Sequence, residues 1–216
     1  MGAGTGKLTR MLVPTGARVI AVEPLQEMRR KLREVVSGVE AIDGTAESLP
    51  VASGAADVVT AAQAAHWFDF DRALPELDRV LAPGGAIVFI WNSRDFDDPL
   101  QSAIEDVLEP RRGSVIMQQE MEWRRPVEAS GVFDEIEQRA FRLEQALTVD
   151  GLVARVSSTS FVAAMVPDER ERLLQRVREL ASGRPEPFPL AYCTEVFVIT
   201  RSSDRSSNAR GTSSKG

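Results

Sequence analysis

Three apolar runs of strand length, each followed by turn or polar residues, constrain the fold most strongly. They are RVIAVEP at 18–24, GAIVFIWN at 85–92 and the weaker DVVTAAQAA at 57–65. A continuous apolar run is typical of a strand that is covered on both faces, as in a parallel sheet between two layers of helices. We therefore expect these runs to be buried strands.

The stretch QEMRRKLREVV at 26–36 has the spacing of an amphipathic helix. Met28, Leu32 and Val35 or Val36 fall on one face, and charged residues occupy the opposite face. This face is expected to pack on the sheet.

A second helix is expected in RALPELDRVL at 72–81, where leucines repeat at helical spacing before Pro83 and two glycines end the pattern. Pro75 is expected in the first turn, where a missing N–H is tolerated. Because strands and helices alternate, the sequence predicts an α/β fold with a doubly wound, Rossmann-like sheet.

The pattern is looser after residue 92. The expected elements are a helix at about 99–108, a strand within 132–149, a short helix capped by Thr148 or Asp150, a helix from Pro167 to Gly183, and a final strand at 192–200. The last residues, 201–216, have no large apolar side chain and are expected to be disordered.

Composition disfavours several classes of function. The 216 residues carry a net charge of −6, so there is no broad basic surplus for a nucleic acid or an anionic membrane. One cysteine, Cys193, and one histidine, His66, supply neither an internal disulfide nor a His/Cys metal site. No apolar run approaches the ~20 residues of a membrane helix, and no signal peptide is visible, so we expect a cytoplasmic protein.

The chain opens with glycines at positions 2, 4 and 6 in MGAGTGKLT. A P-loop would require a glycine at position 1 and a hydroxyl residue at position 8, where this chain has Met1 and Leu8. A dinucleotide fingerprint would require a glycine at position 7, which is Lys7. ATP, GTP, NAD(P) and FAD are therefore disfavoured, whereas a flexible glycine turn without a ligand stays open.

Glu23 ends the first apolar run. A carboxylate at the end of a second strand can accept hydrogen bonds from both ribose hydroxyls. NAD enzymes use an acid in the same way, so Glu23 favours a nucleoside ligand without choosing one. A surface acid at a strand end is the alternative.

Further motifs follow in a fixed order: DGTAESLP at 43–50, QAAHWF at 63–68, RVLAPGG at 79–85, RVSSTSFVA at 155–163 and the terminal YCTEVFVIT. With the G-x-G-x-G opening, this order resembles the class I S-adenosylmethionine-dependent methyltransferases, and in particular a small-molecule subgroup of the methyltransferase type 11 group. The resemblance covers roughly residues 1–200.

The resemblance implies S-adenosyl-L-methionine as the cofactor and a role for each matching residue. The methionine moiety would be lined by Gly2, Ala3, Gly4, Gly6, Gln63 and Ala64. Glu23 would bind the ribose. The adenine would lie near Pro24, Leu25, Thr45, Ala46 and Glu47. Many relatives have an acid where this chain has Thr45, which would be a weaker acceptor for the adenine amino group.

Substrate-side candidates lie at the ends of the later strands. His66 is a candidate general base, with a substrate or cofactor contact and simple packing as alternatives. Trp67 could shield a cationic centre or pack in the core. Trp91 and Asn92 end a strand where open α/β sheets usually bind ligands, and Arg94 could pair with a substrate carboxylate or remain solvated. The expected reaction is in-line methyl transfer to a small molecule.

In the resembling family the glycine loop follows a central first strand, and this chain begins on the loop itself. We therefore expect an N-terminally truncated domain in which the 18–24 and 57–65 strands face an empty position and stability is reduced. Residues 1–92 would form a cofactor-binding half and 93–200 a substrate-side half. An inactive, binding-only remnant is the alternative function, and an NAD(P)-dependent oxidoreductase is a distant one.

Overall fold

The computed structural model describes residues 1–112 and 123–201, which form two compact units. Unit 1 contains residues 1–91, 123–139 and 195–201, and unit 2 contains residues 92–112 and 140–194. The expected disordered tail lies outside the described residues, except for Arg201 at its start.

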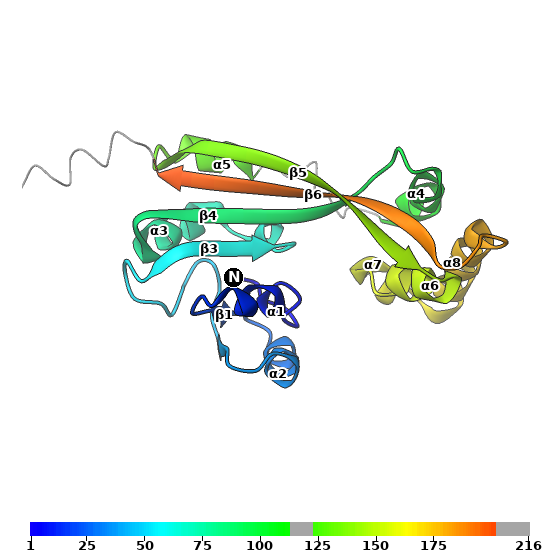
Figure 1. Cartoon of the computed structure of the whole chain (residues 1–216), viewed down its shortest axis with the longest axis horizontal. Coiled ribbons are helices and arrows are strands. Elements are labelled where there is room, and N and C mark those ends of the chain that lie inside the picture. Colours follow the sequence, from blue (N-terminus) through cyan, green and yellow to red (C-terminus); the bar gives the residue numbers. More distant parts are fainter. Residues whose placement is uncertain (113–122, 202–216) are drawn as a thin grey trace, which may run out of the picture. The chain divides into compact units, whose positions relative to one another are not determined.

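Within residues 1–112 and 123–201, six strands form two sheets (Figure 1). The strands are β1 (Ile20–Val22), β2 (Glu40–Ile42), β3 (Ala56–Ala62), β4 (Leu81–Arg94), β5 (Phe133–Leu147) and β6 (Phe188–Arg201). The first sheet pairs β1 and β2 in parallel, and the second has the order β3-β4-β6-β5 with β3 and β4 parallel. The arrow of β6 points opposite to that of β5 in Figure 1. The predicted α/β fold with a C-terminal antiparallel strand is confirmed.

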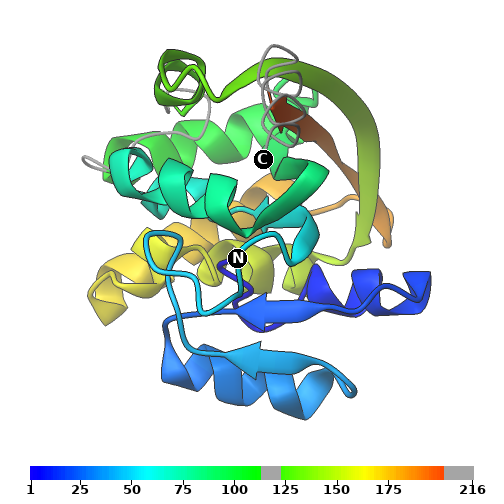
Figure 2. The same ribbon diagram turned by 90° about the vertical axis from the view of Figure 1, so that its left-hand side faces the viewer.

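The edges of β1 and β3 are not paired with each other, and the opening residues hydrogen-bond to both strands. The amine of Met1 donates to the Thr60 carbonyl of β3 at 2.6 Å, and the N–H of Ala3 donates to the Val22 carbonyl of β1 at 3.1 Å. Figure 2 shows β1 and β2 as a separate parallel pair. The opening residues therefore link the edges of these two strands.

The helices of unit 1 are α1 (Thr9–Leu12), α2 (Gln26–Val35), α3 (Phe70–Val80) and α5 (Arg124–Ala129), together with the 3₁₀ turns η1 (Val13–Thr15) and η2 (Ala65–Trp67). The predicted face of α2 is partly wrong. Leu32 and Val36 are buried, whereas Met28 and Val35 are exposed. Leu32 and Val36 lie one turn apart and pack beside Gly6 of the opening loop, so this helix faces the loop along a narrower stripe than expected.

The expected position of Pro75 is also wrong. Helix α3 begins at Phe70, because the Asp69 carbonyl already accepts from the N–H of Ala73 at 2.7 Å. Pro75 is therefore the sixth residue of the helix, beyond the first turn, and it cannot donate to the carbonyl of Asp71.

Strand β4 begins earlier than expected, at Leu81 directly after α3. The Pro83-Gly84-Gly85 turn becomes an irregularity inside the strand, since Ala56 pairs with Leu81 but Val58 pairs with Ala86. Gly84 has φ of +78°, which suits a bulge of this kind.

Unit 2 contains α4 (Pro99–Arg112), α6 (Val149–Ser157), α7 (Ser160–Ala163) and α8 (Pro167–Ala181). Thr148 caps α6 as predicted, because its hydroxyl accepts from the N–H of Gly151 at 3.0 Å. The core of this unit includes Leu100, Ile104 and Leu173, together with the aromatic side chains of Phe188 and Tyr192. Across the described residues, none of the helices combines the length and the apolar character that a membrane crossing needs.

Candidate functional site

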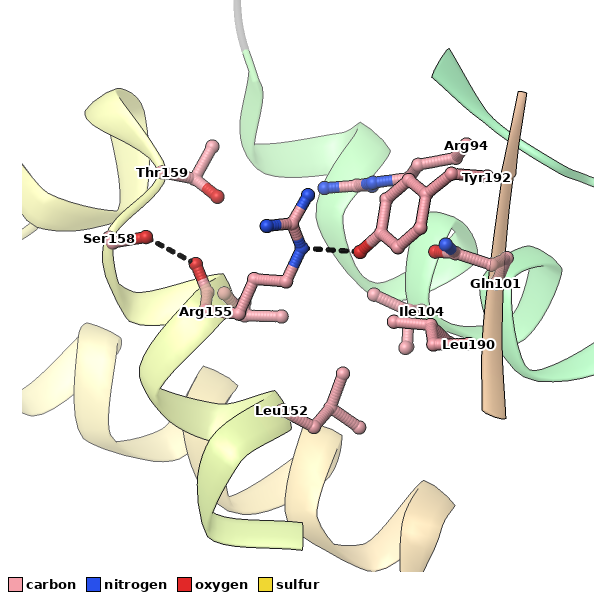
Figure 3. A pocket seen from close by; sticks show the side chains of 10 residues that line it. Arg94, Gln101, Ile104, Leu152, Arg155, Ser158, Thr159, Leu190 and Tyr192 are labelled. Atoms are coloured by element: carbon pink, nitrogen blue, oxygen red, sulfur yellow. Dashed lines mark hydrogen bonds between the residues drawn. The ribbon is translucent and has the colours of Figure 1, made fainter. Parts of the chain in front are cut away.

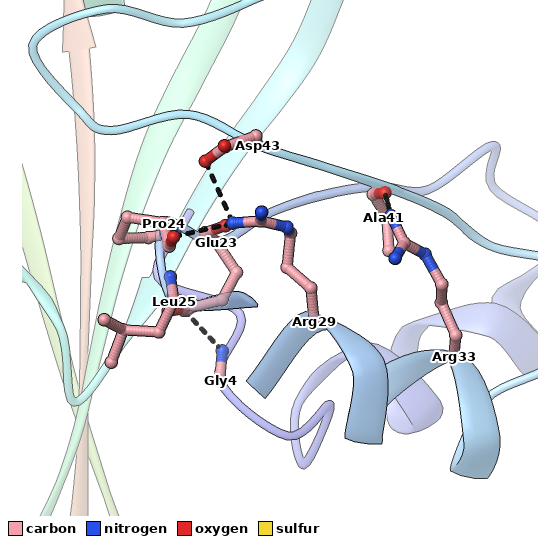
Figure 4. A network of polar contacts seen from close by, with 8 residues as sticks. All are labelled: Gly4, Glu23, Pro24, Leu25, Arg29, Arg33, Ala41 and Asp43. Atoms are coloured by element: carbon pink, nitrogen blue, oxygen red, sulfur yellow. Dashed lines mark hydrogen bonds and ion pairs between the residues drawn. The ribbon is translucent and has the colours of Figure 1, made fainter. Parts of the chain in front are cut away.

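The glycine loop and the acid at the end of β1 meet directly. Glu23 follows the last residue of β1 and is only 5% exposed. Its Oε2 accepts from the N–H of Gly4 at 2.8 Å, and its Oε1 accepts from the N–H of Leu25 at 3.0 Å (Figure 4). Two motifs separated by 19 residues are thus joined through one buried carboxylate.

The three loop glycines have different surroundings, although all have positive φ. A Cβ on Gly2 would lie 2.5 Å from the Cβ of Ala64, and one on Gly6 would lie 2.9 Å from Val36. A Cβ on Gly4, where φ is +56°, would meet nothing within 4 Å. Gly2 and Gly6 therefore allow close packing, and Gly4 faces open space.

Arg29 of α2 connects the turn after β1 to the segment after β2. Its Nη1 donates to the carbonyls of Glu23 at 2.7 Å and Pro24 at 2.6 Å, and to Asp43 Oδ1 at 2.9 Å (Figure 4). Charge-assisted bonds of this kind fix backbone position. The sequence analysis missed Arg29, and the available signal was its position as the fourth residue of the helix that follows Glu23-Pro24.

The residues expected around an adenine differ in exposure. Pro24 and Leu25 are exposed, Thr45 is exposed, and Ala46 is buried. The Oε1 of Glu47 accepts from the N–H of Asp69 at 2.9 Å, at the start of α3. Burial raises the pKa of Glu47, but this N–H and the hydroxyl of Thr45 outweigh it, so the pKa is lowered overall.

The segment after β3 turns sharply. Gln63 has φ of +53°, which is unusual for a residue with a side chain, and its N–H donates to the Ile90 carbonyl at 3.0 Å. Ala64 is buried beside Gly2. The turn therefore brings the end of β3 to the opening loop.

His66 lies next in η2 and is half-buried. Its Nδ1 is buried and has no hydrogen-bond partner among residues 1–112 and 123–201. Burial lowers the pKa of His66, which favours the neutral imidazole at pH 7. An imidazole in this form can accept a proton.

The other substrate-side candidates have diverse surroundings. Trp67 is 78% exposed. Trp91 is 2% exposed and stacks on Trp123 within an aromatic cluster of unit 1. In unit 2, Asn92 accepts from the hydroxyl of Thr194 at 2.6 Å, and Arg94 forms an ion pair with Glu105 at 2.5 Å.

The loop, Glu23 and the β3 turn together fit a nucleoside with an amino-acid tail. Each oxygen of Glu23 accepts one N–H and retains a further lone pair, so the carboxylate can still accept from two hydroxyls. The open space at Gly4 allows a ligand to approach the backbone closely. Within the described part of the chain, no three His, Cys, Asp or Glu side chains are grouped to hold a metal ion.

Comparisons with known proteins agree with this geometry. A family model described as a methyltransferase domain matches residues 1–89. An uncharacterized methyltransferase of Mycobacterium tuberculosis is 36% identical over 185 residues, which cover 86% of this chain and 73% of that protein. An uncharacterized methyltransferase-like protein of Schizosaccharomyces pombe is 30% identical over 203 residues, covering 91% and 79% of the two chains.

Solved structures share the fold. A protein assigned as a type II methyltransferase from Anaeromyxobacter dehalogenans has a TM-score of 0.67 at 23% identity, covering 93% of this chain and 87% of that one. One from Anabaena variabilis, assigned to an antibiotic biosynthesis pathway, has a TM-score of 0.65 at 21% identity, covering 91% and 87%. On the strength of the matching domain and the mycobacterial and yeast relatives, this chain belongs to the class I S-adenosylmethionine-dependent methyltransferases.

Proposed function

We propose that the chain binds S-adenosylmethionine at the loop of Gly4 and Glu23 and methylates a small molecule. The observation that carries this proposal is the buried carboxylate of Glu23, which accepts the N–H of Gly4 and keeps two lone pairs for a ribose. When bound, S-adenosylmethionine supplies a methyl group that its positive sulfur already activates for displacement.

The roles of the protein residues follow from their surroundings. Glu23 accepts the ribose hydroxyls, and the backbone at Gly4 lies against the amino-acid end of the cofactor. Arg29 positions Glu23 and Pro24 through their carbonyls. Neutral His66 is the proposed base for an acceptor that starts protonated; an acceptor that is already a carboxylate needs none.

The first test is calorimetric titration of the folded chain with S-adenosylhomocysteine, with NADH titrated in parallel. Binding of S-adenosylhomocysteine and not of NADH is expected. Stronger binding of NADH, or no binding of S-adenosylhomocysteine by a chain that circular dichroism shows to be folded, would contradict the proposal.

The second test compares Glu23→Gln with Glu27→Gln. An amide has one acceptor oxygen and would also face a backbone N–H with an NH₂ group, so Glu23→Gln should weaken S-adenosylhomocysteine binding at least about tenfold. Glu27 is exposed and pairs with Arg30 on the same helix, so its variant should bind normally. Equal affinities of the two variants for S-adenosylhomocysteine would show that Glu23 does not bind this ligand.

A further inference from the structure

Unit 2 contains a cavity of about 150 Å³ (Figure 3). The described residues that line it all belong to this unit, and they include Arg94 from β4, Arg155 from α6, Thr159 just after α6 and Tyr192 from β6. A cavity of about this volume can hold a benzene-sized molecule. Its ligand is therefore small.

Among the described residues, the lining carries two positive charges and no acid, in a protein whose net charge is −6. Arg94 is neutralised by Glu105 of α4, at 2.5 Å. Arg155 has no acidic partner among the described residues: its Nε donates to the Tyr192 hydroxyl, and its guanidinium lies over the Tyr192 ring at 4.5 Å. One positive charge of the cavity is thus uncompensated.

The contacts of Arg155 hold the guanidinium in place without using its outer nitrogens. Because Nε is directed at Tyr192, Nη1 and Nη2 remain as a parallel pair of donors. A planar pair of N–H donors matches the two oxygens of a carboxylate. Arg155 is therefore arranged to receive such a group.

A hydroxyl and an apolar wall complete the cavity. Thr159 is half-buried, and Figure 3 shows its hydroxyl on the same side of the cavity as the Arg155 guanidinium. Ile104, Leu152 and Leu190 are buried and line the remaining wall. A ligand that fits both parts has one anionic group and a short apolar body.

We propose that this cavity binds a small organic carboxylate, with Arg155 as the bidentate partner of the carboxylate and Thr159 as a second donor. The proposal goes beyond the proposed function and concerns unit 2 alone. It gives Arg155, and not Arg94, the role of pairing with a carboxylate, because Arg94 is already paired with Glu105.

The test uses benzoate, benzamide and phenyl phosphate as probes, with binding to the full chain followed by ligand-detected NMR. Benzoate should bind, and benzamide, which has the same shape without the charge, should bind at least about tenfold more weakly because a charge-assisted pair is lost. Equal binding of benzoate and benzamide would show an apolar cavity only and overturn the proposal. Stronger binding of phenyl phosphate would replace the carboxylate with a phosphate.

Substitutions of Arg155 and Thr159 test whether these two residues bind the carboxylate. Arg155→Gln should weaken benzoate binding about tenfold or more, Arg155→Lys should weaken it less, and Thr159→Val should weaken it a few-fold. Arg178→Gln is the matched control, since Arg178 is exposed in the same unit and pairs with Asp150. If Arg155→Gln does not fold, benzoate binding to Arg155→Lys and Thr159→Val still tests the proposal. Unchanged binding in those two variants, or equal loss in Arg178→Gln, would refute the assignment.

Titration of the wild-type chain with S-adenosylhomocysteine keeps the two proposals separate. Benzoate binding without S-adenosylhomocysteine binding would contradict the proposed function and leave the carboxylate site standing. The reverse result would overturn the carboxylate site alone.

Discussion

Replacing Gly4 with alanine tests whether this glycine is needed to admit a ligand or only to adopt its backbone conformation. Gly4 has φ of +56°, and a Cβ there would meet no protein atom within 4 Å. Alanine also keeps the N–H that donates to Glu23. The folded protein can therefore accept Gly4→Ala at the cost of backbone strain alone.

The size of that strain follows from the conformation. An L-residue in the left-handed region costs roughly 1–2 kcal/mol, and the stiffer unfolded chain returns about 0.4–1 kcal/mol. The net loss is about 1 kcal/mol, which lowers the melting temperature by about 2–4 °C in a protein of this size. Gly16 is a matched control, because its φ is +80° and a Cβ there would also meet nothing within 4 Å.

The two variants should melt alike and bind differently. Calorimetric titration with S-adenosylhomocysteine should show at least tenfold weaker binding to Gly4→Ala, about 1.4 kcal/mol, because the new methyl group occupies the space proposed for the ligand. Gly16→Ala should bind like the wild type. Normal binding by Gly4→Ala, or equal loss in both variants, would refute this assignment of the open space.

Three further predictions concern stability. Pro75→Ala should raise the free energy of unfolding by about 2 kcal/mol, because it restores a donor inside α3; an unchanged or lower urea midpoint would contradict this. The pKa of Glu76 is lowered to about 2 by Arg79 and by the N–H of Leu49, so the stability this carboxylate contributes is present above about pH 4.5 and is lost as the pH falls toward 2. Because both side chains stay partly exposed, the contribution is about 1 kcal/mol, and urea unfolding of Glu76→Gln should differ from wild type at pH 7 but no longer at pH 2. Trp91→Ala should cost about 3–5 kcal/mol and Trp67→Ala less than about 0.5 kcal/mol by the same measurement, and similar losses would refute the contrast in burial.

The sequence predicted the elements whose signal is local. The strands β1 and β3, the Thr148 cap and the Pro167 start of α8 each follow from composition or spacing within a few residues. The prediction failed where a contact between residues far apart in the sequence decides which side chains are buried. Leu32 of α2 and Val36, directly after it, are buried beside Gly6 of the opening loop, and the 26–36 segment contains no sign of that contact.

The opening glycines illustrate the same limit at the candidate site. Their pattern predicts three positions at which a side chain would prevent another group from approaching the backbone. All three glycines have positive φ. The pattern does not say what would be obstructed: for Gly2 it is Ala64, for Gly6 it is Leu32 and Val36, and for Gly4 it is open space. Only the fold shows which glycines allow close packing against another residue and which one leaves room for a ligand.

The two arginines of the unit 2 cavity show where closer reading of the sequence could have gone further. On a helix, an acid three or four residues away usually neutralises an arginine, as Glu27 and Glu34 do for Arg30. Positions 151, 152, 158 and 159 around Arg155 are Gly, Leu, Ser and Thr, so its charge has no local partner. Arg94 is the opposite case: its partner Glu105 is 11 residues away on the next helix, beyond any local rule. Local spacing can therefore single out an arginine that lacks a partner on its own helix, but only the fold shows that Arg155 faces a cavity and that Arg94 is already neutralised.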